Sequence, residues 1–287
     1  MNCFLNSAMT TSPTTSRESR LREALLDALH AQWRELGVPF GSRTWDQPLE
    51  VIDPEALIWC SLEFAGRDPR LIEGVHSWVA DHRSSIVTQR LSTMIRHHAA
   101  DPREQPRCIA MSTCLAATAA TTRRHVGAAA ASAGAIHLRA RDILGNGLAA
   151  FLLVELLGHP RGVRCRQVAE TTGASYRSIV EVAGRWQRSE LVTLDRGFCT
   201  LLDPRPWHEV LRCTPGSIVT VPWNQIYTVL IDHLRELAHV ATVGIADDDR
   251  LIISAARQVR ARVAALVPGL DPSSTPIVTS LLESISD

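Results

Sequence analysis

The sequence predicts a mainly α-helical protein in which β-structure is limited to one hairpin. Apolar residues recur every three or four positions along most of the 287-residue chain, the spacing of a buried helix face. Two Asp-Pro pairs, Asp53-Pro54 and Asp68-Pro69, are typical of helix starts. Only residues 191–201 combine two β-prone runs with a short turn. We therefore expect an N-terminal helical unit, a central unit with a two-stranded hairpin, and C-terminal helices.

Composition and charge limit the classes of partner. The apolar fraction of 45% is ordinary for a globular protein, and 287 residues suffice for two domains. The formal net charge is zero, so contacts with nucleic acid must use local basic patches. The first 20 residues are polar and lack the apolar core of a signal peptide, and the seven cysteines form no close CxxC pair. We expect a cytoplasmic protein with free thiols and no membrane partner.

The N-terminal half divides into three parts. Residues 1–18 are polar and predict a disordered leader. Residues 19–100 predict a compact helical domain, which begins with an amphipathic helix over 21–36 and ends with one over 85–98. Residues 101–146 are rich in Ala and Thr and have few large apolar side chains. They predict a partly helical linker or a helix packed through small residues.

The central unit, residues 147–204, has the order helix, helix, turn, helix, hairpin. Residues 147–158 are strongly apolar, and 164–172 predict a second short helix. Gly173 stands at the turn, where a left-handed φ is favoured, and Ser175 follows as the N-cap of the third helix. Such an order is typical of a module that reads DNA.

This order resembles the winged helix-turn-helix superfamily, which implies a third helix that reads DNA and a hairpin that forms a wing. One difference is Glu190, which stands where glycine often precedes the first strand of the wing. The alternative is a three-helix packing unit with a hairpin that contacts protein. The resemblance covers about a fifth of the chain and is carried by Val168, Ala169, Gly173, Ser175, Ile179, Trp186, Leu191 and Val192.

Local charge places the expected DNA contacts on the third helix and the wing. Seven arginines but only four acidic residues lie between positions 161 and 196. Tyr176 and Arg177 are expected to reach base edges or phosphates, and Glu181 either accepts from a cytosine or pairs with an arginine. A solvated helix face is the alternative for all of these residues. The expected DNA-binding residues are Arg166, Ser175, Tyr176, Arg177, Ser178, Glu181, Arg185, Arg188 and, at the wing tip, Arg196.

The sequence contains no motif for catalysis. It has neither a glycine-rich phosphate loop nor a nucleophile elbow. The pair His97-His98 and the aspartates at 247–249 could bind a cation, but adjacent histidines point apart on a helix and acids are common at helix starts. Cys108 and Cys114 could form a redox pair, although burial explains them more simply. Core packing likewise explains the tryptophans better than an aromatic cage does. We expect no enzyme, no cofactor and no metal site.

Residues 205–287 predict a C-terminal helical region with two long helices. The first has Ile226, Leu230, Leu234 and Leu237 as its apolar stripe. The second has Leu251, Ala255, Val259, Val263 and Leu266 on one face. These helices, or the N-terminal ones, are expected to form a homodimer that reads two half-sites on double-stranded DNA.

The expected function is that of a sequence-specific DNA-binding transcriptional regulator, a repressor or autorepressor. Over residues 50–240 the chain also loosely resembles actinobacterial-type winged-helix proteins that accompany nucleotidyltransferase-type toxins of abortive-infection systems. That resemblance implies an alternative role as a protein-interaction module or antitoxin that neutralises a partner toxin. Antitoxins of that class typically carry the winged helix at the N-terminus, whereas here it is central.

Overall fold

The computed structural model describes residues 13–40, 50–117, 132, 134–145, 147–243, 249–269 and 271–286. The chain is mainly helical, as predicted, with one small antiparallel sheet. Three sequence-based predictions fall wholly or partly outside the described residues. They are residues 1–12 of the predicted leader, the Ala/Thr-rich stretch after residue 117, and the acidic positions 247 and 248. The rest of the predicted leader, residues 13–18, is helical instead of disordered.

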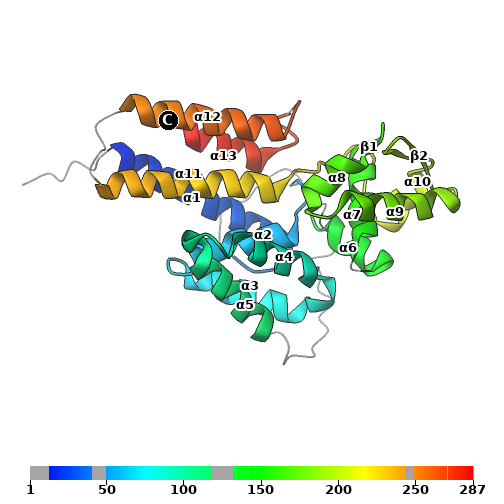
Figure 1. Ribbon diagram of the computed structural model, residues 1–287, viewed down its shortest axis with the longest axis horizontal. Helices are drawn as coiled ribbons and strands as arrows, with labels where there is room; N and C mark the ends of the chain where they lie inside the picture. The colour runs from blue at the N-terminus through cyan, green and yellow to red at the C-terminus, as the bar shows by residue number, and fades with distance from the viewer. Residues whose placement is uncertain are drawn as a thin grey trace, which may run out of the picture.

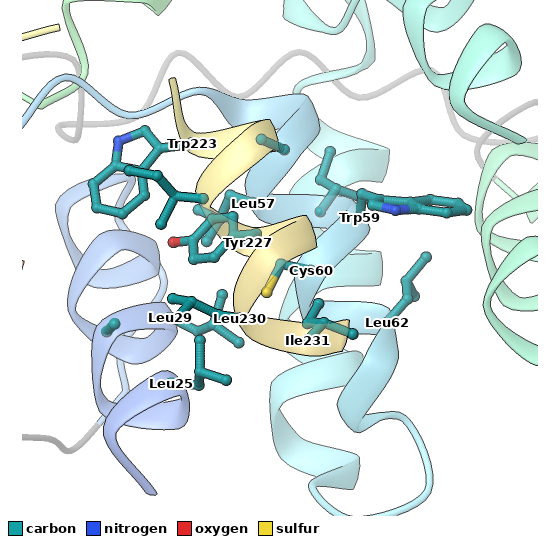
Figure 2. Packing of buried hydrophobic residues seen from close by; sticks show 14 of the residues in the cluster. Leu25, Leu29, Leu57, Trp59, Cys60, Leu62, Trp223, Tyr227, Leu230 and Ile231 are labelled. Carbon is teal, nitrogen blue, oxygen red and sulfur yellow. The ribbon is translucent and has the colours of Figure 1, made fainter. Parts of the chain in front are cut away.

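Long helices from the two ends of the chain pack against one another. They are α1 (Pro13–Glu35), α11 (Trp223–Val243), α12 (Asp249–Leu266) and α13 (Pro276–Ser286), which lie side by side in Figure 1. Leucines of α1, Leu25 and Leu29, meet Tyr227 and Leu230 of α11 in one apolar cluster (Figure 2). The predicted α11 stripe is confirmed, because Ile226, Leu230, Leu234 and Leu237 are all buried. The predicted N-terminal and C-terminal regions therefore share a hydrophobic core.

The predicted face of α12 is wrong at its first position. Leu251 is 65% exposed, whereas Ile252, Val259 and Val263 are buried. Successive residues of an α-helix are separated by about 100° around its axis. The face that meets α11 and α13 therefore begins one residue later than predicted, and Leu251 lies beside it.

Shorter helices follow α1 and cover the same core. They are α2 (Pro54–Ser61), η1 (Leu62–Phe64), α3 (Pro69–Asp81), η2 (Arg83–Ser85), α4 (Thr88–His98), η3 (Pro102–Glu104) and α5 (Gln105–Ala117). Both predicted Asp-Pro starts are confirmed. The Asp53 carboxylate accepts from the amide of Ala56 at 3.1 Å, and Asp68 accepts from Leu71 at 3.0 Å.

The helix α5, at the start of the Ala/Thr-rich stretch, contributes side chains to the core. Cys108, Met111 and Cys114 are buried in the core, together with Leu91 and Met94 of α4. Sulfur side chains fill irregular core space well, and the small residues between them allow close approach. Residues 105–117 therefore pack into the body of the protein instead of linking two parts of it.

Residues 134–145 and 147–212 gather at the opposite end of the molecule from α12 and α13 (Figure 1). Their helices are α6 (Ile136–Leu144), α7 (Leu148–Gly158), α8 (Cys165–Thr172), α9 (Tyr176–Arg188) and α10 (Arg205–Val210). Gly173 ends α8 with a φ of 69°, and the Ser175 hydroxyl caps α9 by accepting from Ser178 at 3.1 Å. Both predicted signals are confirmed. Ile179 and Ala183 are buried as predicted, and Trp186 is partly buried.

The sheet has three strands instead of the predicted two. The hairpin of β2 (Val192–Asp195) and β3 (Phe198–Leu201) is present, and β1 (Val163–Arg164) pairs antiparallel with the free side of β3. A two-residue strand carries too little β-pattern to be identified in a sequence. It forms because β3 offers an unpaired edge.

Two turns near the sheet use left-handed backbone. Glu190 has a φ of 56° where the chain leaves α9, so the turn forms despite the absence of glycine. The amide of Leu191 then donates to the carbonyl of Trp186 at 2.9 Å. Between β2 and β3, Arg196 and Gly197 have φ values of 48° and 79°. Two positive values in a two-residue loop are typical of a type I′ hairpin turn.

Candidate nucleic-acid interface

The outer face of α9 forms an open hollow of about 670 Å³. All of its walls come from this one helix, so it is a depression between side chains instead of a closed pocket. Val180 and Gly184 lie low in it, because the residues around them have longer side chains. The hollow is lined by Tyr176, Arg177, Val180, Glu181, Gly184, Arg185 and Arg188.

The amphipathic pattern of α9 determines which side chains face outward. Ile179, Val182 and Ala183 are buried against the apolar cluster that α7, α8 and the sheet also contribute to. Residues on the opposite side of a 3.6-residue repeat must then face solvent. Five of the predicted site residues therefore lie on a single surface: Tyr176, Arg177, Glu181, Arg185 and Arg188.

Positive charge dominates this surface. Arg177 pairs with Glu181, with 2.9 Å between Nε and Oε1, but the two side chains are 89% and 61% exposed. An exposed pair one helical turn apart contributes only about 0.3–0.5 kcal/mol, so a competing anion can displace Glu181. Among the described residues, Arg185 and Arg188 form no ion pair. Three arginines and one glutamate leave the hollow with a net positive charge.

The hairpin turn lies against the first turn of α9. A Cβ atom added to Gly197 would come within 2.7 Å of the Tyr176 hydroxyl, so these two residues are in contact. Arg196, the other residue of the turn, is exposed. Its guanidinium is therefore carried by a loop that contacts the beginning of the hollow.

The remaining predicted residues differ in position. The Ser175 and Ser178 hydroxyls lie 2.7 Å apart at the N-terminus of α9, where Ser175 already acts as the cap. Arg166 lies on α8, pairs with Glu170 at 3.5 Å, and is not among the residues that line the hollow. Val180 and Gly184 are the lining residues that were not predicted as contacts, although their spacing from Tyr176 places them on the same face.

His98 and Cys114, which belong to two other candidate sites considered in the sequence, have structural roles within the described residues. His98 packs on Trp59, with 5.2 Å between ring centroids, and burial lowers its pKa. Burial raises the pKa of Cys114 to about 11. Within the described ranges, no three His, Cys, Asp or Glu side chains are grouped as a metal ion would need. The core interpretation of the tryptophans is confirmed for Trp33, Trp59, Trp78 and Trp223, which are buried.

Comparison with protein-family models, with curated proteins and with solved structures gave no match to this chain. None of the helices in the described ranges has the length and apolarity needed to cross a bilayer. Function must therefore be inferred from the surface of α9 and the elements around it.

Proposed function

We propose that the protein is a sequence-specific DNA-binding transcriptional regulator, a repressor or autorepressor, that uses residues 147–204 as a winged helix-turn-helix. The observation that carries this proposal is the cationic hollow along α9, with an arginine-tipped hairpin against its beginning. In this proposal α9 lies in the major groove as the recognition helix, and β2 and β3 form the wing.

Arginine is suited to the contacts that this arrangement requires. Its planar guanidinium pairs with the O6 and N7 atoms of guanine or with two phosphate oxygens. Arg177 in the first turn would reach base edges or phosphates, while Arg185 and Arg188 would contact the DNA backbone. Arg196 would meet a phosphate or enter the minor groove.

Gly184 supports close approach of a partner to α9. Glycine inside a helix costs about 0.5–1 kcal/mol relative to alanine. The fold itself does not require it, because an added Cβ would meet only Nη1 of Arg188, at 3.9 Å. A DNA duplex seated against the backbone of α9 gives a reason for a residue without a side chain here.

A homodimer remains part of the proposal, since two copies would read half-sites about one helical turn apart. The exposed apolar residues Leu251 and Ile253 of α12 supply surface for a second copy. Sedimentation of the protein with and without DNA tests this part separately.

DNA binding can be tested by fluorescence anisotropy over a series of salt concentrations, with DNA from upstream of the protein's own gene. Arg177→Ala should weaken binding, and each lost phosphate contact should reduce the salt slope by about 1. Arg196→Asn removes the charge at the wing tip while keeping a residue that tolerates the left-handed turn. Arg103→Ala is the matched control, since Arg103 is 65% exposed but lies in η3.

Two outcomes would overturn the proposal. One is an absence of binding by the unaltered protein at low salt. The other is an equal loss of affinity in Arg103→Ala and Arg177→Ala. If the face around Arg177 retained a protein partner and no DNA, it would serve protein interaction instead.

A further inference from the structure

Four buried charged side chains meet beneath the predicted DNA-reading elements. Asp53 precedes α2, Glu55 lies in α2, Arg90 in α4 and Arg141 in α6, and each is at most 9% exposed. We call these four residues the buried ion cluster. Two carboxylates and two guanidiniums make it electrically neutral.

Hydrogen bonds hold the cluster together in forked pairs. Both Nη atoms of Arg90 donate to the Asp53 carboxylate at 2.5 Å, and Nη1 also reaches Glu55 at 3.1 Å. Arg141 donates to the two Glu55 oxygens at 2.8 and 2.7 Å. Burial alone would raise the pKa of Asp53, but the charge of Arg90 lowers it, so this carboxyl stays ionised. Forked pairs of this kind fix the orientation of both partners.

Arg90 also reaches out of the cluster to the end of α8. Its Nε donates to the carbonyl of Thr172 at 2.9 Å, and Nη2 lies 3.5 Å from the carbonyl of Thr171. The last carbonyls of a helix have no partner within the helix and carry its negative dipole end. A buried cation from a residue 82 positions earlier in the chain satisfies them here.

This contact lies directly before the turn into α9. Gly173 follows Thr172 and reverses the chain, and Ser175 then caps α9. Phe151 of α7 lies under both guanidiniums, with its ring centroid 5.0 Å from Arg90 and 4.9 Å from Arg141. The cluster thus contacts α7 and α8, the two helices on which α9 rests.

We propose that Arg90 is a positioning residue for α9. By holding the carboxyl end of α8, it couples the helices around α2 and α4 to the orientation of the outer face of α9. Buried ion pairs are weak evidence for stability, but they demand one geometry because an unpaired buried charge is costly. The consequence for DNA affinity rests on the proposed function, whereas the coupling between Arg90 and α9 does not.

The test is hydrogen exchange of the full chain carrying Arg90→Lys. Lysine keeps the charge, but its single ammonium nitrogen has only three N–H donors and cannot replace the four bonds that Arg90 makes from three nitrogens to Asp53, Glu55 and the Thr172 carbonyl. Amides in residues 165–188 should then exchange roughly tenfold faster, as expected for loss of a hydrogen bond to a charged group. Arg107→Lys is the matched control. Arg107 is equally buried, but its partners Glu104, Glu63 and Trp59 all lie away from α8.

A second variant covers the case in which Arg90→Lys does not fold. Asp53→Asn combined with Arg90→Gln removes one charge of each sign and keeps an N-cap residue before α2. Glu55 and Arg141 still pair in this variant. It should show the same local increase of exchange in residues 165–188.

DNA binding provides a separate readout. Arg90→Lys should lower the affinity without changing the salt slope, since Arg90 is buried and touches no phosphate. Arg177→Ala should lower both. The positioning role is overturned if exchange in residues 165–188 is the same in Arg90→Lys, or in the double variant, as in Arg107→Lys. If the unaltered protein binds no DNA, the proposed function fails while the exchange experiment still decides the role of Arg90.

Discussion

Glu50 gives the fold a pH dependence that can be measured directly. Its side chain is completely buried, and Oε1 accepts from the amides of Ile277 and Val278 at 3.0 and 3.1 Å, which caps α13. The second carboxylate oxygen has no partner among the described residues. Burial raises the pKa of Glu50 to about 7, although its backbone hydrogen bonds oppose the shift.

The sign and the size of the effect follow from this shift. The folded protein holds the proton on Glu50 up to about pH 7, whereas the unfolded chain releases it near 4.5. The stability contributed by the protonated carboxyl is therefore complete below pH 4.5 and is lost as the pH rises to 7. At 1.36 kcal/mol per pH unit, ionisation removes up to about 3 kcal/mol from the free energy of unfolding.

The perturbation is Glu50→Gln, which cannot ionise and keeps an oxygen to cap α13. Its NH₂ group replaces the unpartnered oxygen, so the substitution also lowers the free energy of unfolding by an amount that does not vary with pH. Urea unfolding at pH 4.5, 6, 7 and 8 should show the variant gaining up to about 3 kcal/mol relative to the unaltered protein across this range. Glu73→Gln, on the exposed face of α3, is the control. A constant difference between Glu50→Gln and the unaltered protein would refute the reasoning.

Three further substitutions test other features. Glu190→Gly should raise the free energy of unfolding by roughly 1 kcal/mol, and with it the melting temperature, because the φ of 56° strains any residue with a Cβ. An unchanged or lower melting temperature would contradict this. Arg141→Met should lower the free energy of unfolding by about 3 kcal/mol or more, since the buried Glu55 carboxylate loses the arginine that bonds both of its oxygens. A loss below about 1 kcal/mol would contradict this, because it would show that Glu55 does not depend on Arg141. Gly184→Ala should stabilise α9 by about 0.5–1 kcal/mol in thermal unfolding yet weaken DNA binding, so unchanged affinity would exclude close approach at this position.

Local signals in the sequence predicted the starts of α2, α3 and α9 well, whereas α1 begins at Pro13 instead of residue 21. A cap is decided by atoms within about three residues, as for Asp53, Asp68 and Ser175. The turn at Gly173 depends only on the backbone freedom of one residue. The face of α9 was predictable for the same reason, because helical periodicity places its residues once its ends are known.

Features that depend on distant residues were not predictable. The strand β1 exists only because β3, more than 30 positions later, offers it an edge. Arg90 and Asp53 are 37 positions apart, and Arg141 and Glu55 are 86 apart. Nothing in the spacing of such residues distinguishes a buried pair from four solvated charges. The burial of Cys108 and Cys114 was expected, but the Ala-rich stretch around them gave no sign of which helices pack against α5, namely α3 and α4.

Arginine occurs in two environments in this protein, and lysine substitution separates them. Arg177 on α9 is 89% exposed, so a lysine there keeps the point charge that a phosphate requires and loses only forked contacts to bases. Arg90 is buried and bonds three groups at once, so a lysine there changes geometry while charge is conserved. Arg177→Lys should therefore reduce sequence discrimination more than non-specific affinity, whereas Arg90→Lys should reduce both together by displacing α9. The relative loss of sequence discrimination and of non-specific affinity, and not the size of either alone, shows whether an arginine contacts DNA itself or positions α9, the helix that contacts DNA.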